Sequence, residues 1–311
     1  MAQTGAIGDL DWIGVDWGTS SLRVWALDAK GRVLDRVASA DGMGTLSGPD
    51  AYEAALLRLA GGWLGGRDMP VPVIVCGMAG ARQGWREADY RRAPCRPAGA
   101  TGLTAVPTRD SRLMVKIIPG ICQDDPADVM RGEETQLAGL VSAIGVSDGI
   151  VCMPGTHSKW VRLANGRVTA FSTVMTGEIH ALMAERSVLR HSLGGDRHDD
   201  DAFAAAVDEM IAAPGSLTAA LFSVRASALL DGVSPAVCRA RLSGLLIGAE
   251  LAAMRDYWKA GTVHVVGAGR LVARYAAAMD IAGATAVPED GEALTLAGLA
   301  AVRAGLDEGM G

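Results

Sequence analysis

The chain has 311 residues, of which 50% are hydrophobic and 21% are charged, a composition far from that of a disordered protein and a length that suits two domains or one large one. With 29 basic against 35 acidic residues, the net charge of −6 disfavours nucleic acid as a partner. The five cysteines form no C-x-x-C pair. The N-terminal segment is too short and too polar for a signal peptide, and no apolar run reaches the ~18 residues that span a bilayer. We therefore expect a soluble, cytoplasmic protein with reduced thiols and no membrane partner.

The first half of the sequence predicts a mixed order of strands and helices. Three short strands come first, joined by turns short enough for antiparallel hairpins. Two later apolar runs are typical of strands that are buried on both faces. In chain order the predicted elements are strands at 12–17, 21–28 and 32–38, a helix at 52–64, strands at 71–78 and 113–120, and a helix from about Gly132.

A similar order begins again after a break near residues 146–148. Ser234 and Pro235 suit the N-cap and first position of a long helix in this half. The predicted elements are strands at 149–155, 159–166 and 167–175, Ala-rich helical sequence at 177–258, a strand at 262–269, a helix at 270–283, a short strand at 285–289 and a closing helix at 292–306. Two halves with one order predict a duplicated α/β fold with domains 1–146 and 147–311.

Each half contains a turn rich in glycine and hydroxyl residues directly after its first strand. In such a turn, successive backbone N–H groups and hydroxyls can hold a phosphate, and a carboxylate at the strand end suits Mg²⁺. Taken alone, either turn also fits an ordinary hairpin. The candidate residues are Asp16, Gly18, Thr19, Ser20 and Arg23 in the first turn, with Asp16 as the Mg²⁺ ligand, and Gly155, Thr156, His157, Ser158 and Lys159 in the second.

A third glycine turn, at Gly267 and Gly269, joins a strand to a helix. It lacks the third glycine of the dinucleotide-binding fingerprint, because Val272 stands at that spacing, and the chain holds no G-x-x-x-x-G-K-[ST] motif. These departures disfavour a Rossmann unit and a P-loop enzyme. The interpretation that remains is a nucleotide held between two similar domains.

The three turns resemble the two phosphate elements and the adenosine element of the actin, hexokinase and Hsp70 ATPase superfamily. Longer strings resemble one family within it, 2-dehydro-3-deoxygalactonokinase, over about residues 12–306. These strings are DVMRGEETQL at 128–137, MPGTHSKW at 153–160, VMTGE at 174–178 and SGLLIGAE at 243–250. The resemblance implies a duplicated ribonuclease-H-like (actin-like ATPase) fold with ATP and Mg²⁺ in an interdomain cleft. It also implies transfer of the γ-phosphoryl group to the 6-hydroxyl of 2-dehydro-3-deoxy-D-galactonate, a step of galactonate breakdown.

The resemblance also implies a catalytic base. Glu133 follows a glycine at the predicted start of a helix, where related carbohydrate kinases carry the aspartate that accepts the hydroxyl proton. Glu134 follows directly, so the choice between the two glutamates stays open. Both also suit the positive end of the helix dipole without any catalytic role, a contribution of about 0.3–1 kcal/mol each.

The sugar acid would need cationic and amide donors for its carboxylate and oxygens. The loop after the strand at 71–78 supplies Arg82, Gln83 and Trp85 as candidates, although arginine on such a loop is often only solvated. Thr176 and Glu178 suit contact with phosphate or sugar, and equally suit capping of the following helix.

Some of the candidate residues have simpler explanations. His157 and Lys159 share one face of a strand and Ser158 takes the other, so only one set can face ATP. His180 and His191 fit surface or satisfied core positions, and Cys152 fits a small buried hydrophobic residue.

Two other functions remain open from the sequence. One is a kinase of the same fold that acts on another sugar or sugar acid, and the other is a nucleotide-gated regulatory protein. DNA-binding regulators of this fold carry an added helix-turn-helix, for which the first strand at residue 12 leaves no room. We expect a small-molecule sugar acid as the partner, and a homodimer is compatible with the sequence.

Overall fold

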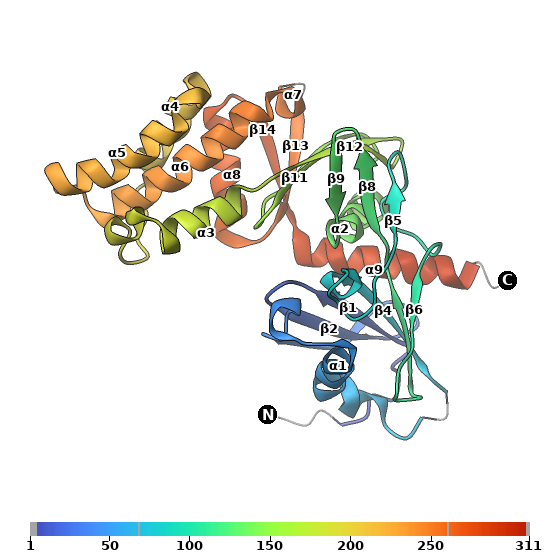
Figure 1. Ribbon diagram of the computed structural model, residues 1–311. Helices are drawn as coiled ribbons and strands as arrows, with labels where there is room; N and C mark the ends of the chain where they lie inside the picture. Colours follow the sequence, from blue (N-terminus) through green and yellow to red (C-terminus); the bar gives the residue numbers. More distant parts are fainter. Residues whose placement is uncertain (1–4, 68, 260, 309–311) are drawn as a thin grey trace. The chain divides into compact units, whose positions relative to one another are not determined.

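The computed structural model describes residues 5–67, 69–259 and 261–308, which form two compact units (Figure 1). Unit 1 runs to Ser147 and also takes in Gly166–Val168 and the segment from Glu292 onward. Unit 2 comprises Asp148–Asn165 and Thr169–Gly291. The chain therefore passes from one unit to the other at four places.

The strands of unit 1 lie in two sheets. They are β1 (Trp12–Trp17), β2 (Leu22–Leu27), β3 (Val33–Ser39), β4 (Val71–Gly77), β5 (Tyr90–Arg92), β6 (Thr104–Val106), β7 (Leu113–Ile117), β8 (Gly120–Asp124) and β9 (Ala127–Met130). The larger sheet has the order β3-β2-β1-β4-β7-β6 and the smaller one β5-β8-β9. In the larger sheet β1, β2 and β3 pair antiparallel, β1, β4 and β7 run parallel, and β6 is antiparallel to β7.

Helices α1 (Pro49–Leu64) and α9 (Gly291–Glu308) cover opposite faces of the six-stranded sheet (Figure 1). Side chains alternate along β1, so Trp17 packs in one core with residues of α1 while Trp12 packs in another with Leu299 of α9. The sequence placed the closing helix in the second domain, and this is corrected by the structure, which groups it with unit 1. The physical reason is that its apolar side chains bury Trp12.

Unit 2 is built on a five-stranded sheet of its own. Its strands are β10 (Gly149–Met153), β11 (Ser158–Ala164), β12 (Arg167–Val174), β13 (Thr262–Gly267) and β14 (Thr285–Asp290). They lie in the order β12-β11-β10-β13-β14, with β10 antiparallel to β11 and parallel to β13, and β13 parallel to β14. This is the order of β3-β2-β1-β4-β7 in unit 1, so the predicted duplication is confirmed.

The remaining helices of unit 2 pack around this sheet and one another. They are α3 (Thr176–Arg186), α4 (Asp200–Ala212), α5 (Leu217–Leu230), α6 (Pro235–Ala253), α7 (Arg255–Trp258) and α8 (Gly269–Ile281). Ser234 caps α6 as predicted, because its side chain accepts a hydrogen bond from the Val237 N–H at 3.4 Å and Pro235 opens the helix. Apolar side chains of α4, α6 and α8 form one core with β10, β11 and β13.

Four short strands, β5, β6, β8 and β9, were not predicted. Each has only three to five residues, and none shows a long apolar run. The polar stretch after the strand at 113–120 is a turn between β8 and β9 rather than a direct lead into α2 (Glu133–Gly139). The long helical region of the second half is divided into α3 to α7.

Two expectations from composition concern cysteines and membrane segments. All five cysteines are free, and Cys152 is fully buried, as predicted. Within the described ranges no single helix has the length and apolar character needed to cross a membrane, although α4 and the segment Pro214–Leu230 meet that requirement together across a bend of 110°.

Candidate functional site

In unit 2 the turn after β10 rests on the first turn of α3. A Cβ atom at Gly177 would lie 2.2 Å from the carbonyl oxygen of Gly155, so only glycine permits this approach. The N–H of Glu178 donates to the carbonyl oxygen of Thr156 at 2.9 Å. The predicted phosphate turn is therefore held directly against a helix N-terminus, where backbone N–H groups and the helix dipole favour an anion.

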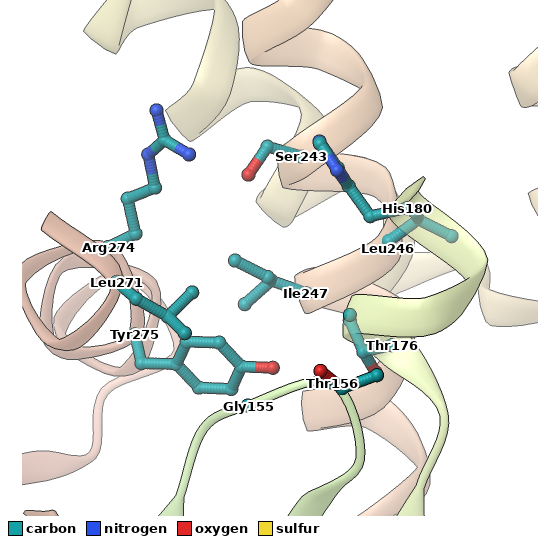
Figure 2. A pocket seen from close by; sticks show the side chains of 11 residues that line it. Gly155, Thr156, Thr176, His180, Ser243, Leu246, Ile247, Leu271, Arg274 and Tyr275 are labelled. Atoms are coloured by element: carbon teal, nitrogen blue, oxygen red, sulfur yellow. The ribbon is translucent and has the colours of Figure 1, made fainter. Parts of the chain in front are cut away.

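A cavity of about 280 Å³ opens beside this turn (Figure 2). Its middle is apolar, with Ile247 of α6 and Leu271 of α8 pointing inward, and its ends carry polar groups. The lining residues are Gly155, Thr156, Thr176, Gly177, His180, Ser243, Leu246, Ile247, Leu271, Arg274 and Tyr275. A mainly apolar cavity with a few polar groups is the usual form of a small-molecule site.

His180 differs from the expectation of a surface or satisfied core residue. Its side chain lines the cavity, and its Nε2 atom is buried and has no hydrogen-bond partner among the described residues. Burial lowers the pKa of His180, and the nearby charges of Arg274 and Arg239 lower it further, so the ring is neutral near pH 7. The sequence carried no signal for this role, because only the fold brings α3 beside α6 and α8.

The other predicted residues of the second turn separate into exposed and buried groups. His157 is exposed, and its Nε2 lies 2.5 Å from the Glu178 carboxylate. Ser158 is fully buried, with its hydroxyl 2.9 Å from that of Tyr275, and Lys159 is 4% exposed and donates to the carbonyl oxygen of His157 at 3.3 Å. The structure thus brings Gly155 and Thr156 to the cavity surface but places Ser158 behind its wall.

Thr176 was expected either to contact a ligand or to cap α3. The N-cap of α3 is Met175, with no side-chain cap, so the capping interpretation is wrong. Thr176 is the first residue of the helix, lines the cavity and hydrogen-bonds through its side chain to the buried carboxylate of Glu250. The Thr176 hydroxyl is therefore directed toward the Glu250 carboxylate and not toward the free N–H groups at the start of α3.

Gly267 and Gly269 lie at the end of β13 and the start of α8, as predicted. They line a second cavity of about 400 Å³, together with Ala268, Val272, Ala273, Pro288, Glu289 and Asp290. A Cβ atom at Gly267 would lie 2.9 Å from the side chain of Val272. This glycine therefore serves the packing of α8, and neither glycine lines the cavity beside Gly155.

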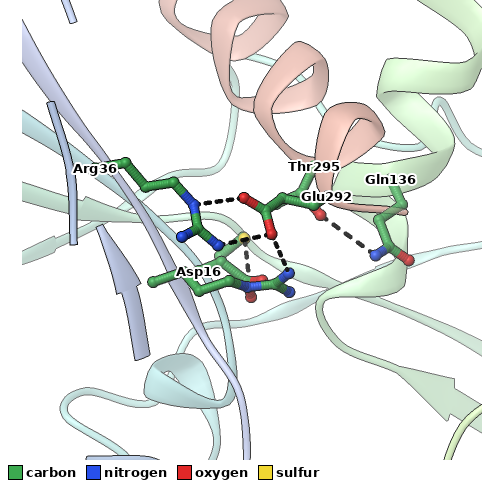
Figure 3. Close-up of polar contacts among 7 residues, drawn as sticks. Asp16, Arg36, Gln136, Glu292 and Thr295 are labelled. Atoms are coloured by element: carbon green, nitrogen blue, oxygen red, sulfur yellow. Dashed lines mark hydrogen bonds and ion pairs between the residues drawn. The ribbon is translucent and has the colours of Figure 1, made fainter. Parts of the chain in front are cut away.

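In unit 1, Asp16 stands near the end of β1 within a chain of charged groups (Figure 3). Its carboxylate pairs with Arg23, whose Nη1 also lies 3.4 Å from Glu292, and Arg36 binds Glu292 at 2.6 Å and 2.9 Å. Burial raises the pKa of Asp16, and the charge of Arg23 opposes that rise. Arg23 is therefore engaged by two carboxylates, a contact that the prediction of a phosphate ligand did not include.

Two glycines with positive φ bring three elements together next to Asp16. A Cβ atom at Gly77 (φ +85°) would lie 2.5 Å from the carbonyl oxygen of Trp17 and 3.5 Å from Oδ1 of Asp16. At Gly132 (φ +107°) it would lie 3.4 Å from the Cα of Gly77. The ends of β1 and β4 and the start of α2 therefore converge beside Asp16, whose Oδ1 also accepts from the Cys76 thiol at 3.8 Å.

The two glutamates at the start of α2 have different environments. Glu134 is fully buried, and its carboxyl accepts hydrogen bonds from the Gly132 N–H at 2.6 Å and the Thr135 hydroxyl at 3.1 Å. Burial, with the charge of Glu133 adding to it, raises the pKa of Glu134 to about 8. Glu133 is half-buried and accepts from the Arg131 N–H at 3.0 Å. At neutral pH Glu134 holds a proton, and this distinction was not available from the sequence.

The loop after β4 separates its three predicted residues. Arg82 and Gln83 are exposed, as a ligand-binding role requires. Trp85 is only 4% exposed, and its ring packs against Trp17 and Tyr52, with ring centroids 5.8 Å and 6.2 Å away. The predicted contact of Trp85 with substrate is therefore replaced by a core position, because aromatic partners from β1 and α1 cover it.

Thr19 and Ser20, in the turn between β1 and β2, are exposed. The carbonyl oxygen of Thr19 accepts from the Gly44 N–H at 2.9 Å, and the N–H of Gly18 donates to the Ser21 carbonyl oxygen at 2.8 Å. Within the described part of the chain, no three His, Cys, Asp or Glu residues gather as a metal site would require.

The comparisons with known proteins identify the family. A model of the 2-keto-3-deoxy-galactonokinase family matches residues 16–302. The chain belongs to this family. It is 43% identical to a probable 2-dehydro-3-deoxygalactonokinase of Rhizobium meliloti (strain 1021) over 92% of this chain and 94% of the relative. It is 36% identical to 2-dehydro-3-deoxygalactonokinase of Escherichia coli (strain K12) over 94% and 97%.

The solved structures support the fold. A crystal structure from Sinorhizobium meliloti that carries the same kinase name matches with a TM-score of 0.86 and 41% identity, over 94% of this chain and 95% of that one. Component A of (R)-2-hydroxyglutaryl-CoA dehydratase from Acidaminococcus fermentans matches with a TM-score of 0.50 and 11% identity, over 96% and 99%. The chain has the duplicated α/β fold of the actin-like ATPases and sugar kinases.

Proposed function

We propose that the protein is a 2-dehydro-3-deoxygalactonokinase that uses ATP to phosphorylate the 6-hydroxyl of 2-dehydro-3-deoxy-D-galactonate. The observation that carries the proposal is the family match over residues 16–302, supported by relatives of that name at 43% and 36% identity. The reaction belongs to the breakdown of galactonate.

The nucleotide would bind to unit 2, in the cavity beside the turn after β10. The apolar walls formed by Ile247 and Leu271 suit the base, and Ser243, His180 and Arg274 offer polar contacts at one end. At the other end Gly155 and Thr156 meet the start of α3, which suits phosphate. Gly267 and Gly269 do not line this cavity. They remain predicted adenosine contacts because they precede and begin α8, the helix that contributes Leu271 and Arg274 to the cavity.

Mg²⁺ would be held by Asp16 of unit 1. Mg²⁺ commonly takes one or two carboxylates and completes its shell with water and substrate phosphates. Asp16 fits this requirement, because its carboxylate stands near the end of β1 with 14% of its side chain exposed and a cation would offset the cost of its burial. When bound, the ion would neutralise phosphate charge during transfer.

The chemical step needs an acceptor for one proton. The 6-hydroxyl oxygen forms a bond to the γ-phosphorus, the bond from that phosphorus to ADP breaks, and the hydroxyl proton passes to Glu133. Glu133 suits the role because it is half-buried, whereas the neighbouring Glu134 is fully buried and already protonated. Arg82, exposed after β4, is the candidate for the substrate carboxylate, with Gln83 beside it.

The test is a coupled ADP assay on the purified protein with a panel of acceptors. The panel contains the galacto acid, its gluco epimer 2-dehydro-3-deoxy-D-gluconate, gluconate and glucose, and phosphorus NMR locates the new ester. We expect turnover of the 3-deoxy galacto acid with phosphate on its 6-oxygen. Turnover of glucose or gluconate alone would instead support another sugar kinase, and ATP binding with no turnover of any acceptor would support a regulatory protein.

A further inference from the structure

A buried glutamate that no predicted role uses lies at the back of the unit 2 cavity. Glu250 of α6 is 2% exposed, and both of its carboxylate oxygens are occupied. The Trp160 indole N–H donates to Oε1 at 2.8 Å, and the Tyr275 hydroxyl donates to Oε2 at 2.7 Å. The side chains of Thr176 and Ser158 also hydrogen-bond to it. One carboxylate therefore gathers four partner side chains from β11, α3 and α8.

The Trp160 hydrogen bond fixes Oε1 of Glu250 as an acceptor. An indole N–H can only donate, and a carboxylate can only accept, so the pair has one possible direction. The Tyr275 hydroxyl donates to Glu250 and lies 2.9 Å from the Ser158 hydroxyl. Burial raises the pKa of Glu250, and the hydrogen bonds from its partners act in the opposite direction. A buried polar network of this kind fixes the positions of its members.

The network borders the cavity on one side only. Thr176 and Tyr275 line the cavity (Figure 2), and Ser158 begins the strand that follows Gly155 and Thr156. Trp160 does not line it, because its indole lies in the core behind Glu250. Thr176 and Tyr275 therefore transmit the position of Glu250 to the cavity wall, whereas Trp160 does not.

We propose that Glu250 is a positioning residue for the nucleotide, because it fixes the Thr176 and Tyr275 hydroxyls and the base of the Gly155–Thr156 turn. The proposal rests on the proposed binding of ATP in this cavity. Glu250 itself is behind the wall, so its loss changes nucleotide affinity rather than the chemical step.

Glutamine at position 250 has the same shape but the wrong hydrogen-bonding pattern. Its single oxygen would face Trp160, because the indole N–H can only donate, and its amide NH₂ would then face the Tyr275 hydroxyl. In the wild type the one Tyr275 proton goes to Glu250, so Tyr275 accepts from Ser158. In the variant Tyr275 would have to accept from the glutamine amide and donate to Ser158 instead. We expect Glu250→Gln to raise the Kd and KM for ATP about tenfold, equivalent to about 1.4 kcal/mol, with kcat within about threefold of wild type.

The experiment compares Glu250→Gln and Tyr275→Phe with a matched control, Trp160→Phe. The control removes a donor from the same carboxylate without touching the cavity. Binding of Mg²⁺ and the non-hydrolysable analogue AMPPNP is measured by calorimetry, and kcat, the KM of each substrate and Tm are measured for each variant. We expect weaker AMPPNP binding in Glu250→Gln and Tyr275→Phe, and a lower Tm with a Kd within twofold of wild type in Trp160→Phe.

A double variant adds a readout that general damage would not give. If Glu250 acts through Tyr275, adding Tyr275→Phe to Glu250→Gln weakens AMPPNP binding little further. Wild-type Kd in both single variants, or an equal loss in Trp160→Phe, would overturn the proposal and leave Glu250 a purely structural residue. Should Glu250→Gln fail to fold, Tyr275→Phe and Thr176→Val still decide it, because wild-type affinity in both would overturn it.

The same data separate this inference from the proposed function. Wild-type protein that binds AMPPNP but phosphorylates no sugar acid would contradict the proposed reaction and leave the comparison of variants valid, since that comparison uses Kd. Wild-type protein that binds no adenine nucleotide would overturn both.

Discussion

Two adjacent glutamates at the start of α2 have the same side chain but different degrees of burial. Glu133 retains exposed atoms, whereas Glu134 is fully buried with a pKa of about 8. We expect Glu133→Gln to lower kcat by about 10²–10⁴-fold with little change in substrate KM, because a general base contributes mainly in the transition state. Steady-state kinetics with ATP and the 3-deoxy galacto acid measure both constants.

Glu134→Gln is the matched control for that prediction. Glutamine resembles the neutral carboxylic acid, so the hydrogen bond from the Gly132 N–H can be retained and kcat should stay within a few-fold of wild type. If Glu134→Gln were the inactive variant instead, the base would be Glu134 and the neighbouring residue would only support the helix.

The same carboxyl predicts a pH dependence of stability. In an unfolded chain glutamate titrates near pH 4.3, whereas burial raises the pKa of Glu134 to about 8 in the folded protein. Between these values the folded state binds the extra proton, so the stabilisation present at low pH is lost as the pH rises toward 8. We expect the unfolding free energy of wild type, relative to Glu134→Gln, to fall by at most about 1.4 kcal/mol per pH unit. Urea unfolding from pH 5.5 to 8.5 tests this, and parallel curves for the two proteins would contradict it.

Asp16 should control the response to magnesium. We expect Asp16→Asn to lose most activity and to need a higher Mg²⁺ concentration for half-maximal rate, because a neutral amide holds a hard cation poorly. A magnesium titration of the rate measures this. Asp28→Asn is the control, since Asp28 pairs with Arg32 in the turn before β3 and should alter stability only. An unchanged magnesium response in Asp16→Asn would make Asp16 a structural partner of Arg23.

For single residues, the sequence was sufficient to predict turns and charged positions but not which side chains are buried. The turn after β10, the place of Asp16 near the end of β1 and the start of α2 at Glu133 could all be predicted, because each depends on neighbours in the chain. The burial of Trp85 and Ser158 could not, since it depends on partners far away in the sequence, such as Tyr52 and Tyr275.

Two glycines allow α2 and α9 to cross in close contact. A Cβ atom at Gly298 would lie 1.9 Å from the Thr135 carbonyl oxygen, and one at Gly139 would lie 2.0 Å from that of Leu294. We expect Gly298→Ala to separate the helices, cost about 1–3 kcal/mol of stability and lower kcat by moving Glu133. Thermal unfolding and kinetics on the same sample test both effects.

Gly61→Ala provides the control for a glycine-to-alanine change within a helix. A Cβ atom at Gly61 of α1 would lie 3.8 Å from the Leu57 side chain, an ordinary contact. We expect it to be neutral or to stabilise by about 0.5–1 kcal/mol, through the helix propensity of alanine. Equal losses in Gly298→Ala and Gly61→Ala would show that close helix contact is not the cause.

Element length explains which parts of the fold could be predicted. Strands such as β4 contain continuous apolar runs, and α6 begins with its own cap at Ser234. The local sequence was therefore sufficient to predict these elements. The strands β5 and β6 have three residues each and form because neighbouring strands offer hydrogen bonds, β8 to the first and β7 to the second. That pairing partner is not visible in a local pattern.

In the molecule as a whole, unit 1 is assembled from both ends of the described chain. Leu299 of α9 is fully buried in one core with Trp12, Trp25 and Leu27. We expect Leu299→Ala to cost about 2–5 kcal/mol, because it leaves a cavity against these side chains. Hydrogen exchange measured by mass spectrometry should show lost protection in β1 and β2 as well as in α9. Loss confined to α9 would mean that the sheet does not depend on this helix.

The placement of α9 also sets an order of events when the protein is made. A ribosome that has completed the chain to Ser147 must still add the 143 residues from Asp148 to Asp290 before it reaches the first residue of α9. At about 5–20 residues per second, this takes roughly 7–30 s. Until then α9 cannot cover the face of the first sheet that carries Trp12 and Trp25. This interval is long enough for chaperones to bind that face. The nascent protein should therefore depend on chaperones most strongly in the half that is synthesised first.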